Sequence, residues 1–69
     1  MKYGEYFKAQ RELVGLSQSE LSKKTGLSQQ MISHWENNKG EPGIEKLVVL
    51  ADFYGISLDE LIGRTVKTD

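Results

Sequence analysis

A group of short or planar hydrogen-bonding side chains lies on one predicted helix in the first half of the chain. Positions three or four apart on a helix share a face, which places the whole group on a single side. Its members are Gln29, Gln30, Ser33, His34 and Asn37. Ile32 and Trp35 fall on the other side and are expected to enter the core. A helix with such a face is suited to recognising a surface that presents hydrogen-bonding groups.

Glutamine can recognise base edges, because its amide can make two hydrogen bonds with N6 and N7 of adenine in the major groove. Gln29 and Gln30 stand just inside the predicted start of the helix, where a recognition helix usually meets base edges. Glutamines are also common on solvated helices, and spacing alone favours neither interpretation. His34 has three interpretations: it donates to guanine, it donates to a phosphate, or it is an exposed histidine without a role.

The elements that hold this helix are marked by capping residues. Ser17 followed by Glu20 predicts a capping box at one helix start, and Ser28 predicts the cap of the next helix. Gly26 lies between them, where a left-handed residue can end the first helix. Residues 17–37 are therefore predicted to form two short helices joined by a tight turn.

A helix is predicted before this pair, ending at Gly15, because apolar side chains recur at the spacing of an amphipathic helix. The stripe consists of Tyr3, Tyr6, Phe7, Gln10, Leu13 and Val14. After the pair, Lys39 to Gly43 form a loop that contains Pro42.

Two more helices are predicted after the loop. One runs from Ile44 to Tyr54, and the other starts after the cap Ser57 and ends at Gly63. The first has an apolar stripe of Ile44, Leu47, Val48, Ala51 and Tyr54, broadened by Leu50 and Phe53. No segment alternates with period two, so we predict an all-α domain of five helices over residues 1–63. Residues 64–69 are expected to be a frayed tail.

Composition narrows the class of protein. The chain has 69 residues, no cysteine and no cluster of metal-ligating side chains, so we expect one small domain without disulfides, metal or cofactor. Its charged, amphipathic N-terminus resembles neither a signal peptide nor a membrane span. We therefore expect a soluble cytoplasmic protein that does not contact a membrane.

The net charge of −1 argues mildly against a nucleic-acid partner. The distribution of charge along the chain weakens this argument against a nucleic-acid partner. Residues 1–39 carry six Lys and Arg and four acids, a net of +2, whereas residues 40–69 carry three and six, a net of −3. The half that contains the predicted recognition helix is therefore the positive one.

Arg11 and Glu36 each lie beside an apolar stripe, since Arg11 follows Phe7 by four positions and Glu36 follows Ile32 by four. An unpaired charge at the margin of a core is costly, so we expect the two to pair. We assign this pair a structural role.

The order of these features resembles the Cro/C1-type (XRE family) helix-turn-helix domain, which has the lambda-repressor-like fold. The resemblance covers about residues 6–62 and combines several motifs at family spacing. They are Leu16-Ser17-Gln18, Glu20-Leu21, Gly26-Leu27-Ser28, Ile32-Ser33, Trp35-Glu36-Asn37, Pro42 and Leu58-Asp59-Glu60-Leu61. The resemblance implies a prokaryotic or phage transcriptional regulator, most simply a repressor, that binds double-stranded DNA with helix 28–37 in the major groove.

The same resemblance implies roles for single residues. Base contacts are implied for Gln29, Gln30, Ser33 and His34, and phosphate contacts for Gln18, Ser28, Asn37 and Lys39. The Arg11–Glu36 bridge is also a family feature. This sequence departs from the family at Asn38, where a glycine usually follows the asparagine. Asparagine tolerates the left-handed conformation better than most residues, so the turn is expected to survive.

The resemblance further implies a homodimer formed through the C-terminal helices, where Phe53, Leu58 and Ile62 are candidates for an exposed apolar patch. Such a dimer would bind a palindromic, operator-like site with half-sites one turn of DNA apart.

The composition also bears on two other classes of function. The first is a helical protein-interaction module, such as an antitoxin or adaptor that has lost DNA affinity. The net negative charge of the chain favours this alternative. An enzyme is not expected, because one histidine and no cysteine leave no credible nucleophile, metal site or acid–base pair. Met31, Trp35, Phe53 and Tyr54 are typical of a core at helical spacing, so no small-molecule ligand is expected.

Overall fold

The computed structural model describes residues 3–64, and within this range the chain is all-helical, as predicted. Its five helices are α1 (Gly4–Leu13), α2 (Gln18–Thr25), α3 (Gln29–Glu36), α4 (Ile44–Tyr54) and α5 (Leu58–Leu61). The tail predicted for residues 64–69 lies outside the described residues except for Arg64. No helix among the described residues is long and apolar enough to cross a bilayer.

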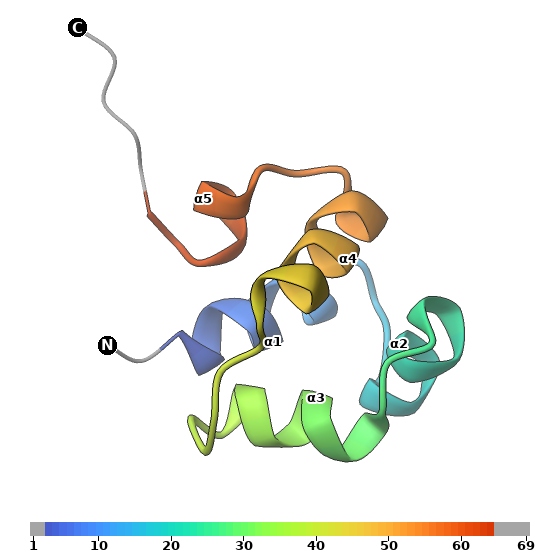
Figure 1. Ribbon diagram of the computed structural model, residues 1–69. Coiled ribbons are helices and arrows are strands. Elements are labelled where there is room, and N and C mark those ends of the chain that lie inside the picture. The colour runs from blue at the N-terminus through green and yellow to red at the C-terminus, as the bar shows by residue number, and fades with distance from the viewer. Residues whose placement is uncertain (1–2, 65–69) are drawn as a thin grey trace, which may run out of the picture.

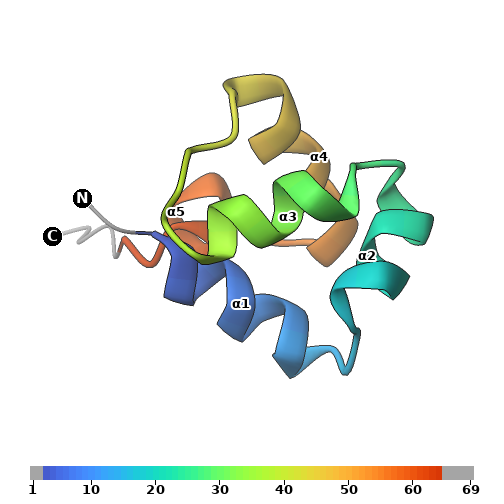
Figure 2. The ribbon, with the colours of Figure 1, turned by 90° about the horizontal axis from the view of Figure 1, so that it is seen from below.

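The helices form two groups around one core. α3 packs against α1 and α2, while α5 packs against α4 and α1, and α4 also contacts α2. In Figure 1, α3 lies along the lower edge of the molecule, with α4 and α5 above it. Seen from below, α3 crosses the front of the molecule between α1 and α4 (Figure 2). One side of α3 therefore faces solvent along its whole length.

Helix ends follow the predicted capping residues. The capping boxes of Ser17 with Glu20 and of Ser57 with Glu60 are both present. The Ser28 side chain caps α3 by accepting a hydrogen bond from Met31 N. Gly26 ends α2 in the left-handed conformation, with φ at 78°. Local sequence therefore sets where α2 and α3 begin and where α2 ends.

The core is a single cluster contributed by all five helices and the turn between α2 and α3. Leu61 is fully buried, although it belongs to the shortest helix. The buried apolar residues are Phe7, Leu21, Leu27, Ile32, Trp35, Leu50, Ala51 and Leu61. Two of them, Ile32 and Trp35, lie on α3 and fix which side of that helix faces outward.

The buried face of α1 differs from the predicted stripe. Gly4, Phe7 and Arg11 face the interior, whereas Leu13 is 78% exposed and Tyr6 is also exposed. A glycine and an arginine therefore replace two of the expected apolar contacts. The apolar pattern could not identify this face, because two of its three buried members are not apolar side chains.

The stripe predicted for α4 was also partly wrong. Leu50 and Ala51 are buried, but Ile44 and Val48 are exposed. α4 is apolar around most of its circumference, so several faces satisfy the helical period equally well. Contact with α2 and α5 selects the Leu50–Ala51 side.

Arg11 and Glu36 form the predicted ion pair between α1 and α3. Arg11 Nε donates to Glu36 Oε2 over 2.7 Å, and Arg11 Nη2 donates to Glu36 Oε1 over 2.9 Å. The two residues are only 8% and 9% exposed. The hydrogen bond to the Glu36 carboxylate is the main cause that raises the pKa of Arg11, so the guanidinium stays charged at neutral pH.

Tyr54 brings a hydroxyl group to the interior near this pair. The hydroxyl has no hydrogen-bond partner among residues 3–64. Burial raises the pKa of Tyr54 to about 12, with a smaller contribution from the charge of Glu36. Tyr54 therefore stays neutral at physiological pH and adds no third charge beside the ion pair.

A second contact joins α1 to the end of α3. Asn38 adopts a left-handed conformation with φ at 60°, and its Oδ1 accepts a hydrogen bond from Gly4 N over 2.9 Å. Asn38 thus caps α1, whose N-cap residue Tyr3 makes no side-chain capping bond. A Cβ on Gly4 would collide with the backbone carbonyl of Glu36. The glycine is needed because the two backbones approach so closely.

We expect Glu36→Ala to lower the free energy of unfolding by about 3–5 kcal/mol, because it leaves the buried Arg11 guanidinium without its counter-ion. Chemical denaturation followed by circular dichroism measures this change. The matched control is Glu45→Ala on the exposed surface of α4, with an expected change below about 0.5 kcal/mol. Equal midpoints for Glu36→Ala and the unmodified protein would rule out a structural role for the pair.

We expect Gly4→Ala to lower the free energy of unfolding by about 1–3 kcal/mol, because the added methyl group forces α1 away from the end of α3. Gly40→Ala is the control, since a Cβ there meets open space and the residue is outside the left-handed region. That variant should be neutral or stabilised by up to about 1 kcal/mol. The contact is not tight if both variants unfold at the same denaturant concentration.

Candidate nucleic-acid interface

α3 has one buried side and one exposed side. Ile32, Trp35 and Glu36 are buried against the other helices, while Gln29, Gln30 and His34 are exposed. Both glutamines belong to the first turn, directly after the capping residue Ser28. The exposed side of the helix therefore presents amide and imidazole groups beside the thioether of Met31, and it begins at the helix N-terminus.

Five of the eight residues predicted to contact nucleic acid line one surface depression of about 420 Å³. They are Gln18, Gln29, Gln30, Ser33 and His34. Gln18 comes from the first turn of α2, and the other four come from α3. No Asp or Glu belongs to this lining. Gln18, which precedes Gln29 by eleven positions, is thus brought to the same concave surface as the four residues of α3. This surface has no acidic side chain.

Gln18 is held in place by a contact that the sequence analysis did not predict. Its Nε2 donates to Glu36 Oε1 over 3.1 Å, so the carboxylate of the ion pair also binds a residue of the depression. The side chain is half-buried. Only the angle between α2 and α3 brings these two residues together, and no spacing pattern in the sequence signals that angle.

Ser28 and Asn37 lie outside this depression and have local hydrogen bonds at the two ends of α3. Ser28 Oγ accepts from Met31 N over 3.4 Å. Asn37 Nδ2 donates to the carbonyl of Ser33 over 2.8 Å and lies 3.4 Å from Ser33 Oγ. Both side chains are exposed. Each therefore keeps further hydrogen-bonding capacity directed away from the helix end that it caps.

Lys39 follows the helix end and is also exposed. Its backbone N–H donates to the His34 carbonyl over 2.8 Å, while Asn38 N donates to the Trp35 carbonyl over 3.2 Å. This pair of bonds is a Schellman motif with Asn38 as its left-handed residue. Asn38 therefore adopts the left-handed conformation at the position where the family usually has glycine. The two hydrogen bonds also fix the backbone of Lys39 relative to the end of α3.

Exposed basic residues lie at the far ends of the two helices that form the depression, whereas Glu20 is exposed in the first turn of α2 and the Glu36 carboxylate bonds to Gln18. Lys23 and Lys24 occupy the last turn of α2 and are exposed, as is Lys39 beyond α3. Acidic residues concentrate in the second half of the chain, on the loop, α4 and α5. They are Glu41, Glu45, Asp52, Asp59 and Glu60. In Figure 1, α4 and α5 lie on the side of the molecule opposite the exposed side of α3.

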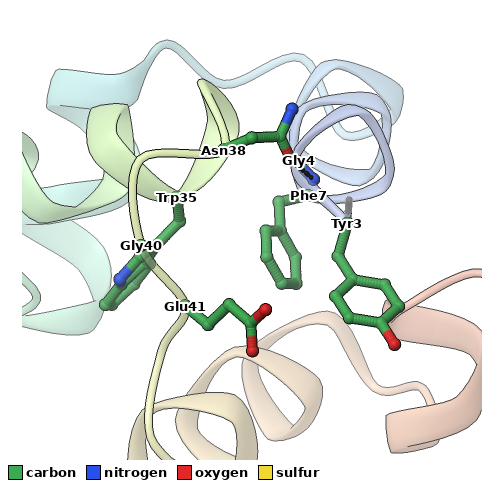
Figure 3. Close-up of a pocket in the computed structure, with 7 residues that line it drawn as sticks. All are labelled: Tyr3, Gly4, Phe7, Trp35, Asn38, Gly40 and Glu41. Atoms are coloured by element: carbon green, nitrogen blue, oxygen red, sulfur yellow. Dashed lines mark hydrogen bonds between the residues drawn. The ribbon is translucent and has the colours of Figure 1, made fainter. Parts of the chain in front are cut away.

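A separate pocket of about 120 Å³ lies between the start of α1 and the loop after α3. In Figure 3 the Phe7 ring points into the space between α1 and the loop, the Trp35 ring lies by Gly40, and the Glu41 side chain extends from the loop below Phe7. None of the eight predicted contact residues lines it. Among residues 3–64, no three His, Cys, Asp or Glu side chains gather in a way that could hold a metal ion.

Known proteins that are similar to this chain in sequence include transcriptional regulators. The chain is 36% identical over 64 residues to the cryptic phage CTXphi transcriptional repressor RstR of Vibrio cholerae, a match covering 93% of this chain and 57% of that protein. It is 32% identical over 62 residues to the HTH-type transcriptional activator BcrR of Enterococcus faecalis, covering 90% of this chain and 30% of that protein. This chain thus spans between 30% and 57% of these relatives' length.

The fold is shared with a solved structure, a transcriptional regulator from Listeria innocua. The two superpose with a TM-score of 0.80 at 23% identity, over 96% of this chain and 62% of that one. A family model described as helix-turn-helix matches residues 7–61, which include all of α2, α3, α4 and α5. The chain therefore belongs to the helix-turn-helix family of the Cro/C1 (XRE) type.

Proposed function

We propose that this chain is the sequence-specific DNA-binding part of a prokaryotic or phage transcriptional regulator, and that α3 enters the major groove of double-stranded DNA. The observation that carries the proposal is the shared depression, where Gln18, Gln29 and Gln30 present amide groups on one uncharged surface. An α-helix with side chains is about 10–12 Å across, and the major groove of B-DNA is about 12 Å wide.

In this arrangement α3 reads bases and its surroundings bind the DNA backbone. Gln29 and Gln30 are at the N-terminal end of the helix, from which a recognition helix contacts base edges. Ser33 and His34, one turn further on, are assigned additional base contacts. Gln18 is assigned to a backbone phosphate, because it opens α2 and helix N-termini present free N–H groups to anions.

Ser28, Asn37 and Lys39 complete the backbone contacts at the two ends of α3. Ser28 and Asn37 are exposed caps with hydrogen-bonding capacity to spare, and Lys39 supplies a positive charge. The positive half of the chain thus meets the phosphates, while the acidic α4 and α5 stay away from them. This separation of charge weakens the objection that a net charge of −1 raises.

We further propose that the protein acts in the cytoplasm as a homodimeric repressor on a palindromic site. Phe53 and Leu58 are exposed apolar residues on α4 and α5, and Val49 lies one turn before Phe53. Ile62 is half-buried against the core, so it would be at most the edge of a dimer contact. A two-fold dimer presents its recognition helices to half-sites about 34 Å apart. Occupying an operator blocks transcription without any enzymatic activity.

Selection from a pool of random DNA duplexes tests this proposal most directly. We expect an enriched sequence with two-fold symmetry and half-sites separated by one helical turn. An enriched but asymmetric site would support DNA reading and contradict the dimer. No enrichment at low salt, together with an unaltered retention time on heparin, would instead favour a protein-interaction module.

We expect Gln30→Ala to relax sequence preference at one position of the selected site by about 1–3 kcal/mol, because a bidentate contact to a base is lost. Binding to a panel of single-base variants of the site measures the change. Affinity for unrelated duplexes should stay the same and serves as the control. If the preference at every position is unchanged, Gln30 is not a base-reading residue.

We expect Lys39→Ala to weaken binding to all duplexes equally and to reduce the slope of log affinity against log salt by about 0.9, since one phosphate contact is lost. Lys39→Arg keeps the charge and is the matched control, with the slope unchanged. A slope that is the same in Lys39→Ala and in the unmodified protein would place Lys39 away from the DNA backbone.

A further inference from the structure

Glu36 joins the ion pair of the core to the edge of the candidate interface. Its Oε1 accepts two hydrogen bonds, from Arg11 Nη2 over 2.9 Å and from Gln18 Nε2 over 3.1 Å. Its Oε2 accepts from Arg11 Nε over 2.7 Å. The carboxylate is therefore fixed by the guanidinium, and it provides a fixed acceptor for the Gln18 amide.

Arg11 also holds the start of α2 directly. Its Nη1 donates to the carbonyl of Leu16 over 2.8 Å, and Leu16 immediately precedes the cap of α2. One guanidinium thus contacts the backbone before α2 and the side chain at the end of α3. The separation between Gln18 on α2 and the exposed face of α3 is set by this group of hydrogen bonds.

The hydrogen bond from Gln18 also decides how its amide is oriented. A carboxylate accepts hydrogen bonds and cannot donate them when ionised, so only the Nε2 end of the amide can face Glu36. A phosphate likewise accepts only from donors, and Gln18 Nε2 carries a second N–H for that purpose. Without Glu36, the amide is free to rotate its carbonyl oxygen toward a phosphate, where it would be repelled.

We infer that Glu36 is a positioning residue for DNA binding, because its carboxylate orients the Gln18 amide toward a backbone phosphate beside the bases that α3 reads. This inference rests on the proposed function and adds to the purely structural role of the ion pair. The structural role concerns the stability of the fold, whereas the positioning role concerns the affinity of the folded protein for DNA.

A double-mutant cycle on the selected duplex tests the inference. We expect Gln18→Ala to weaken binding about fivefold in the unmodified protein, as the loss of one hydrogen bond would. In the Glu36→Gln background, Gln18→Ala should weaken binding less than about twofold, since the amide is no longer oriented. Circular dichroism at low temperature verifies that all four proteins are folded at the concentration used.

Gln29→Ala supplies the matched control for the cycle. Gln29 lines the same depression but makes no hydrogen bond with Glu36. Its substitution should weaken binding by the same factor in both backgrounds. If Gln18→Ala is also additive with Glu36→Gln, Glu36 acts on stability alone and the inference is wrong.

A measurement on the free protein covers the case in which Glu36→Gln folds poorly. Nuclear magnetic resonance relaxation of side-chain NH₂ groups should show Gln18 to be more restrained than Gln29 and Gln30, which make no side-chain hydrogen bond within residues 3–64. Equal mobility of the three amides would overturn the inference. Failure of the unmodified protein to select any duplex would instead overturn the proposed function, and the inference with it.

Discussion

A carboxylate that is almost completely removed from water must be surrounded by hydrogen-bond donors, and this requirement at Glu36 determines how the first three helices meet. Arg11 supplies two of the donors and Gln18 supplies a third. Because the guanidinium is planar, its two bonds to the carboxylate fix a direction as well as a distance. These bonds link α1, α2 and α3 and restrict their relative arrangement, because a buried charge without its partners is costly.

As a consequence, α3 contributes side chains both to the core and to the exposed surface. Its Ile32 and Trp35 lie in the apolar cluster, and Glu36 closes the polar network on the same side. The opposite side is left with amide, hydroxyl and imidazole groups, and both of its glutamines stay exposed. Recognition of base edges requires a rigid helix with free hydrogen-bonding groups on its outer side, such as the amides of Gln29 and Gln30.

Local signals predicted the helices well because they depend on neighbouring residues only. The caps at Ser17, Ser28 and Ser57 and the left-handed Gly26 each act over three or four positions. Apolar stripes were less reliable, because they identify a buried face only where that face is apolar. In α1 the interior face includes Arg11, and α4 is apolar on several sides.

By itself, the sequence determined where the helices begin and end, which side of α3 carries the amide groups, and that Arg11 and Glu36 should pair. These properties follow from short-range spacing and from the cost of burying an unpaired charge. Only the tertiary structure decided that Gln18 shares the carboxylate of Glu36 and that Asn38 caps α1 through Gly4. The contact between Gln18 and Glu36 spans 18 positions of the sequence, and the contact between Gly4 and Asn38 spans 34. Both contacts depend on the angles at which the helices cross, and these angles are set jointly by the packing of the core and by the buried ion pair.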